Sequence, residues 1–205
     1  ENIMPLGANK AAIMGVAGVS TEDVVLLSSQ TASGDTTISF TTDLTTTYSI
    51  YVFRLYNINI SSGNSYIQWQ VNASGQTGYN EDIQSTAVRA WHYEDDSVAA
   101  LHYKTAWDQA LGDNIFQYMT NGGSADTDSS ESGELWLFNP SSTTYAKHFM
   151  SRFSCTGHTH STTGPASQLQ YYAGYINTTS AIDDIQFKGG PSTTFDGAIK
   201  LWGLK

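Results

Sequence analysis

Short segments in which apolar and polar residues alternate recur from Val24 to the end of the 205-residue chain. The clearest is Tyr66–Ala73, in which Ile67, Trp69 and Val71 are separated by polar residues. Successive side chains of a strand point to opposite faces, so this alternation is typical of a strand with one covered face. The dominant local structure is therefore expected to be extended.

The longest of these segments is Tyr48–Ile60, which is aromatic and β-branched on both of its faces. That composition predicts a central strand covered on both sides. The turn residues Ser61–Asn64 separate it from Tyr66–Ala73, so the two strands are expected to pair as a hairpin. Further strands are expected at Val24–Ser29, Thr36–Thr41, Glu134–Phe138, Tyr145–Cys155, Gln168–Ile176, Ala181–Phe187 and Ala198–Leu204, with two short ones within 98–119.

This series predicts an all-β antiparallel sandwich or jelly roll of about 8–10 strands. Residues 1–22 are rich in Gly and Ala and lack alternation, which favours an extended N-terminal arm, with a disordered tail as the alternative. The domain is expected to span 23–205, with an irregular middle segment at 76–132. Within that segment, Glu81–Trp91 fits a short helix or a long excursion. Asn121–Gly133 fits a polar loop without core residues.

The charge of the chain excludes several kinds of partner. Charged residues make up 14% of the sequence and the net charge is −10. The nine Lys and Arg residues form no basic run, which argues against binding to nucleic acid or to an anionic membrane surface. Cys155 is the single cysteine, so an internal disulfide and a zinc site with several thiolates are excluded.

Two histidines form the sharpest candidate for a metal site. His158 and His160 are two residues apart, and in a strand both imidazoles could reach one ion. The flanking Gly157 and Ser161–Gly164 favour a loop instead, in which the histidines are simply exposed. We therefore expect no metal and no cofactor, with His158 and His160 as weak candidates.

The remaining reactive residues favour structural roles. Cys155 is expected to be a small buried side chain, because a nucleophile needs a base and an oxyanion hole that its neighbours in sequence do not supply. The carboxylates Asp126, Asp128, Glu131 and Glu134 are expected to lie in solvent rather than to bind calcium, because EF-hand spacing is missing. No catalytic motif is recognisable, so we expect the chain not to be an enzyme.

The aromatic residues divide into core and surface candidates. Trp69 and Trp136 lie in expected strands, which favours the core. The irregular middle holds the candidates for an exposed recognition surface, namely Trp91, His92, Tyr93 and Trp107. Aromatic side chains beside Asn, Asp and Gln suit a glycan or a protein partner.

Four segments carry an ordered series of packing motifs. They are LLSSQTASGDTTISF (Leu26–Phe40), TTYSIYVFRLYNINISSGNSYIQWQVNASG (Thr46–Gly75), GELWLFNPSSTTYAKHFMSRFSC (Gly133–Cys155) and SAIDDIQFKGGPSTTFDGAIKLWGLK (Ser180–Lys205). The last looks like a terminal hairpin that ends in Phe-x-Gly-x-Ile-x-Leu-aromatic-Gly. The series resembles small structural proteins of tailed, especially marine, bacteriophages, of the head-decoration and fibre type. The resemblance covers 24–75 and 133–205 and leaves out the middle segment.

The resemblance implies a virion structural protein, assembled in the cytoplasm of a bacterial host. Its first expectation is a capsid decoration or cement protein that binds the head shell, with the major capsid protein or tail proteins as partners. The arm residues expected to anchor it are Lys10, Ile13, Met14 and Val16. The alternative is a tail-fibre or receptor-binding domain that recognises a host glycan. Either protein is expected to be a homo-oligomer, with a trimer as one option.

Overall fold

The computed structural model describes residues 23–160 and 164–205, apart from the side chains of 158–160 and 164–165. These residues form an all-β domain. Its strands are β1 (Val24–Asp35), β2 (Thr37–Phe40), β3 (Ile50–Ile60), β4 (Ile67–Ala73), β5 (Ile83–Tyr93), β6 (Ala99–Tyr103), β7 (Gln117–Tyr118), β8 (Glu131–Phe138), β9 (Lys147–His160), β10 (Gly164–Ile176), β11 (Ile182–Gly189) and β12 (Phe195–Leu204). The part of the chain described here contains no helix long and apolar enough to span a membrane.

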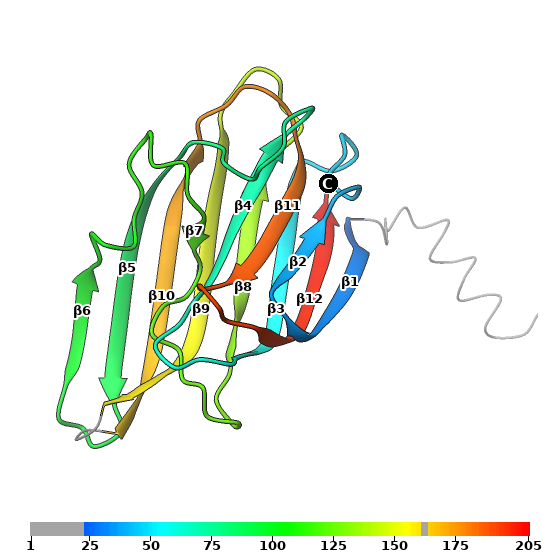
Figure 1. The fold of residues 1–205 in the computed structure, drawn as a ribbon. Helices are drawn as coiled ribbons and strands as arrows, with labels where there is room; N and C mark the ends of the chain where they lie inside the picture. The colour runs from blue at the N-terminus through cyan, green and yellow to red at the C-terminus, as the bar shows by residue number, and fades with distance from the viewer. Residues whose placement is uncertain (1–22, 161–163) are drawn as a thin grey trace, which may run out of the picture.

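The strands form two antiparallel sheets that pack as a sandwich (Figure 1). The larger sheet has eight strands in the order β1-β12-β3-β8-β9-β10-β5-β6. The smaller sheet has four, in the order β2-β11-β4-β7. The predicted all-β antiparallel sandwich is confirmed. The described residues form twelve strands, because 83–93 is the strand β5, while β6 and β7 match the two short strands expected within 98–119.

Aromatic side chains from both sheets meet in the core. Trp69 on β4 packs edge-on against Phe149 on β9, with ring centroids 4.9 Å apart. Phe53 on β3 contacts Phe40 of β2 at 5.4 Å and Phe187 of β11 at 5.2 Å. All five rings are almost completely buried. The core therefore joins the two sheets through interlocked rings, which add to the stabilisation from apolar burial.

Both predicted hairpins are wrong. β3 lies in the eight-stranded sheet and β4 in the four-stranded sheet, so the turn at 61–66 crosses between sheets. β11 and β12 are separated in the same way, with β11 paired to β2 and β4. Alternation specifies which face of a strand is covered but not its partner, and a crossing connection resembles a hairpin turn in sequence.

The segment expected as a helix or an excursion is the strand β5. Ile83, Ser85 and Ala87 are buried, whereas Gln84 and Thr86 between them are exposed. This period of two overrides the helical spacing of the apolar residues, because β5 pairs along its whole length with β10. Three of the predicted recognition residues, Trp91, His92 and Tyr93, therefore belong to a strand of the larger sheet.

The polar side of β4 also differs from expectation. Gln68, Gln70 and Asn72 point away from the larger sheet yet are buried. The Gln70 amide donates to the carbonyl oxygens of Glu81 and Ile115, both at 2.9 Å. The loops that follow β4 and β6 therefore cover this sheet, and the amides satisfy the covered backbone.

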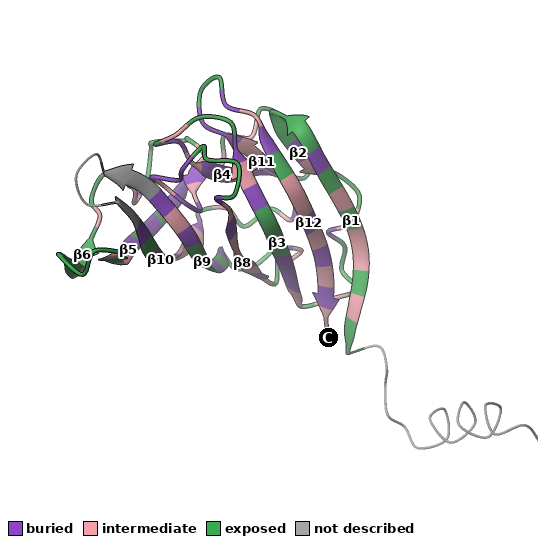
Figure 2. Ribbon diagram, turned by 90° about the horizontal axis from the view of Figure 1, so that it is seen from below, coloured by how far each residue is buried: buried purple, intermediate pink, exposed green. Residues whose placement is uncertain are grey.

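The residues that the structure describes cover the larger sheet on one side only. Along β3, Tyr51 and Phe53 are buried toward the smaller sheet, whereas Arg54 and Tyr56 are exposed on the opposite face. The prediction that this strand is covered on both sides is therefore wrong. Figure 2 shows buried and exposed residues alternating across the sheet. The predicted arm at 1–22 lies outside the described residues.

Candidate functional site

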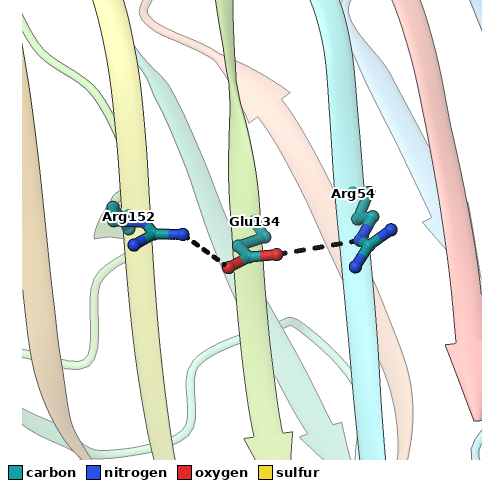
Figure 3. Close-up of polar contacts among 3 residues, drawn as sticks. All are labelled: Arg54, Glu134 and Arg152. Atoms are coloured by element: carbon teal, nitrogen blue, oxygen red, sulfur yellow. Dashed lines mark hydrogen bonds and ion pairs between the residues drawn. The ribbon is translucent and has the colours of Figure 1, made fainter.

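Three charged side chains form a row across the open face of the larger sheet (Figure 3). Arg54, Glu134 and Arg152 occupy paired positions on β3, β8 and β9. A Glu134 oxygen lies 3.3 Å from an Arg152 nitrogen, and its other oxygen lies 3.7 Å from Arg54 Nε. Lys200 on β12 continues the row beside Arg54. Three of these four charges are positive, although the whole chain carries −10.

The next row of the same face is apolar. Trp202, Val52, Trp136 and Met150 occupy successive paired positions on β12, β3, β8 and β9. Val52 is buried between its neighbours, whereas Met150 is 41% exposed. Trp136 also stacks on Phe138, two positions along β8, at 6.5 Å. The apolar row and the charged row therefore run side by side.

Shallow pockets lie between these rows. One of about 380 Å³ is lined by Trp136 and Met150 of the apolar row, by Glu134 and Arg152 of the charged row, and by Phe138 and Tyr171. A second of about 320 Å³ continues beside it toward Leu169, which is 48% exposed. The residues that form this surface, called the sheet-face patch below, are Arg54, Glu134, Trp136, Phe138, Met150, Arg152, Leu169 and Tyr171.

The open face becomes polar at its far end. A pocket of about 580 Å³ there is lined by His92 and by serines and threonines of β8, β9 and β10. His92 Nε2 lies 2.9 Å from an Asp96 carboxylate oxygen, and both side chains are exposed. Most of the described groups that line this pocket are hydroxyls, with Glu94 as its one carboxylate, so it suits hydrogen bonding better than acid–base chemistry.

A second, separate site lies on the inner face of the larger sheet. Arg89 on β5 packs against two indoles, with its guanidinium carbon 4.2 Å from the Trp91 ring centroid and 4.9 Å from that of Trp107. Lys104 Nζ also lies over the Trp107 ring, 4.8 Å from its centroid. Burial lowers the pKa of Arg89, and the neighbouring Tyr93 and Tyr172 raise it.

The Arg89 side chain borders a pocket of about 210 Å³. Its other walls include Asn64, Trp91 and Gln168. Arg89 and Gln168 converge at Gly122: a Cβ built there would lie 4.0 Å from Arg89 Nη1 and 3.9 Å from Gln168 Nε2. Gly157 leaves room for the Gln168 carboxamide, which a Cβ would overlap. We call this the Arg89 pocket.

The buried titratable residues lie between the sheets. Glu131 is 3% exposed, and burial raises its pKa to about 7, an effect that the nearby Thr120 hydroxyl reduces. Burial and Glu131 together raise the pKa of Cys155 well above its usual range. A thiol that stays protonated is a poor nucleophile, and the predicted burial of Cys155 is confirmed.

The four predicted recognition residues do not form one surface. Trp91 faces inward with Arg89, whereas His92 faces the open side of the sheet. Tyr93 lines pockets at the end of β5 on both sides. Trp107 packs partly against the core. These residues were expected in an irregular segment. Because side chains alternate along β5, Trp91 and His92 lie on opposite faces of the sheet.

Other predictions change in detail. Trp136 was expected in the core and lies on the open face. Glu131 was expected in solvent and is buried at the start of β8. His158 and His160 were expected in a loop and belong to β9, but their side chains are outside the described ones. Among the described residues, no three His, Cys, Asp or Glu side chains gather as metal ligands.

The sheet-face patch was missed by sequence reasoning. Its apolar residues alternate with buried ones along β8 and β9, so each strand has apolar side chains on both faces. That pattern was a usable signal. A strand that is apolar on both sides, in a sheet covered on one, leaves an exposed apolar face.

Comparisons with known proteins add no relative. No protein-family model matches the chain, and no curated protein matches it. Among solved structures, the chain aligns with the crystal structure of an infectious bursal disease virus VP2 subviral particle. The alignment has 11% identity and a TM-score of 0.15, and it covers 89% of this chain and 40% of that one. A score this low carries no argument. Fold and surfaces define the chain as an antiparallel two-sheet β-sandwich with one open sheet face.

Proposed function

We propose that the chain is a non-enzymatic structural protein that attaches to another protein through the sheet-face patch. In this proposal the protein decorates the head shell of a tailed bacteriophage particle. The observation that carries the proposal is the apolar row of the partly exposed Trp136 and the exposed Met150 beside the ion-paired row of Arg54, Glu134 and Arg152. Soluble proteins rarely leave such a contiguous face without a partner.

The size of the open face supports a protein partner. Eight strands spaced about 4.8 Å apart make a sheet roughly 30 Å across. A specific interface needs about 800 Å² from each partner, which a face of this width and of comparable strand length provides. An aromatic and methionine centre with arginines at its side is also the composition that protein interfaces favour.

The charges specify the partner more closely. The row of Lys200, Arg54, Glu134 and Arg152 has three cations and one carboxylate. A partner with carboxylates around an apolar centre would complement it, because opposite potentials guide docking and fix its register. The rest of this acidic chain would in turn repel such a partner, which restricts docking to the patch.

The proposed lack of catalysis rests on the same geometry. Glu134 lies between two arginines, whose nitrogens are 3.7 and 3.3 Å from its two carboxylate oxygens. The Glu131 and Cys155 side chains are only 3% and 4% exposed, although Cys155 also borders the 580 Å³ pocket. Among the described residues, the open face therefore presents groups suited to packing and hydrogen bonding.

A reattachment assay tests the proposal. Virions of the phage that encodes the chain are prepared with the gene deleted, and purified chain is added back. Met150→Glu places a charge in the apolar row, whereas Tyr145→Ser changes a 71% exposed residue that does not line the patch and serves as the matched control. We expect wild type and Tyr145→Ser to bind heads in many copies, and Met150→Glu to bind about tenfold or more weakly, the loss expected from one poorly placed charge at an interface. Absence of the wild-type chain from heads, or equal binding by Met150→Glu, would refute the proposal.

A further inference from the structure

We propose that the Arg89 pocket binds a carboxylate-bearing sugar residue. The pocket and the sheet-face patch lie on opposite faces of the larger sheet, so this inference does not depend on the proposed docking function. It assigns ligand recognition to Arg89, Trp91, Asn64 and Gln168, of which the sequence pointed to Trp91 alone.

The indoles fix the direction of the Arg89 guanidinium. Both indoles pack against it, with the Trp91 and Trp107 ring centroids 4.2 and 4.9 Å from its central carbon. Nη1 faces the pocket at Gly122. No acceptor in the described part of the chain reaches Arg89 Nε. A guanidinium held in this way is preorganised for the two parallel hydrogen bonds that a carboxylate accepts.

The electrostatics of the pocket favour an anion. Across residues 23–160 and 164–205, no described carboxylate lies within ion-pair distance of Arg89 or Lys104. The two cations share the Trp107 ring, and burial first and the Arg89 charge second lower the pKa of Lys104. An anionic ligand would relieve this repulsion and supply the missing partner. On a chain with a net charge of −10, two unpaired cations side by side mark a specific site.

The remaining walls favour a sugar over a simple anion. Asn64 and Gln168 bring carboxamides, which can donate to and accept from hydroxyl groups. Trp91, which packs against Arg89 and His102, adds an apolar wall for the C–H groups of a sugar ring. The volume of about 210 Å³ is below the 300–1,000 Å³ typical of drug-sized sites, so it suits one ring at a time.

Calorimetry and tryptophan fluorescence with three probes test the inference. The probes are glucuronic acid, glucose, which lacks the carboxylate, and acetate, which lacks the ring. We expect glucuronic acid to bind about tenfold or more tightly than either of the others, because charged and neutral contacts add. Equal binding of glucose would remove the role of the carboxylate. Equal binding of acetate would remove the role of the sugar ring. Either result would overturn the inference.

Variants locate the site. Arg89→Gln should weaken binding of glucuronic acid about tenfold or more, since it removes a charge-assisted pair. Asn64→Gly removes the carboxamide, and glycine tolerates the backbone angle φ of 63° at this position. This variant should weaken binding a few-fold. Arg152→Gln makes the same change of charge on the opposite face and should leave binding unaltered. If Arg89→Gln does not fold, Arg89→Lys keeps the charge without the planar fork and should still bind several-fold more weakly. Unchanged binding by a folded Arg89 variant would overturn the inference.

Discussion

Glu131 on β8 and Cys155 on β9 lie directly opposite each other, and both side chains are buried between the two sheets. The Thr120 hydroxyl is the one polar group that counters the effect of burial on the Glu131 carboxyl, and burial outweighs it. Burial raises the pKa of Glu131 to about 7, so the carboxyl is neutral in the folded protein at mildly acid pH. The core therefore contains an acid that ionises near neutral pH at a cost to stability.

The first prediction is that the protein loses stability between about pH 4.5 and 7. In this range the folded chain keeps the Glu131 proton while the unfolded chain releases it, so the free energy of unfolding falls as the pH rises. The loss amounts to about 3 kcal/mol above pH 7. Glu131→Gln should be more stable than wild type by up to about 3 kcal/mol at pH 8, and nearly equal to it at pH 4.5. Urea denaturation at both pH values measures this.

Glu134→Gln is the matched control for that experiment. It changes an ion pair on the surface, so it should alter stability by less than about 1 kcal/mol at either pH. If Glu131→Gln had the same effect at pH 4.5 and pH 8, the carboxyl would not be titrating in the core, and the burial assigned to it would be wrong.

Two tryptophans test which faces are covered. Trp69 lies at the centre of the core against Phe149, whereas Trp136 lies partly exposed on the open face. Trp69→Ala should lower the free energy of unfolding by about 3–5 kcal/mol, because it leaves a cavity between the sheets. Trp136→Ala should lower it by about 1–2 kcal/mol, since its ring is only partly buried. Thermal or urea denaturation measures both losses. A larger loss from Trp136→Ala than from Trp69→Ala would contradict the assignment of Trp69 to the covered face and Trp136 to the open face.

Gly133 tests the packing of the central strands. A Cβ at this position of β8 would collide with the carbonyl oxygen of Arg152 and lie 2.7 Å from the Phe153 ring. Because both neighbours belong to the middle of β9, neither can move freely, and Gly133→Ala should cost about 3 kcal/mol. Ser132→Ala, at the adjacent position, should cost less than about 1 kcal/mol. Circular dichroism during thermal unfolding compares the two, and equal melting temperatures would contradict the close approach of β8 and β9.

The sequence predicted local structure better than assembly. Alternation located β2, β4 and β10 because a covered face leaves a period of two. It did not separate β3 from β4 or β11 from β12 into different sheets, since the choice of partner depends on contacts remote in sequence. The sequence pattern favoured the core for Trp136, because an apolar residue in a strand does not indicate which face of the sheet is left open.

The candidate sites show the same limit. The Arg89 pocket joins residues from four segments, with Asn64, Arg89, Gly122 and Gln168 brought together by folding. Sequence reasoning selected Trp91 and Trp107 as aromatic, but it did not select the arginine between them. A single Arg in a strand has no local pattern, and its partners are defined only when β5 pairs with β10.

Oxidative footprinting of the sheet-face patch is the most direct measurement of its proposed role. Free chain and chain assembled in virions are exposed to hydroxyl radicals, and the oxidation of Met150 and Trp136 is compared with that of Tyr145, which does not line the patch. We predict strong protection of Met150 and Trp136 in the particle and little change at Tyr145. Equal oxidation of Met150 and Trp136 in the free and assembled states would contradict docking through this face.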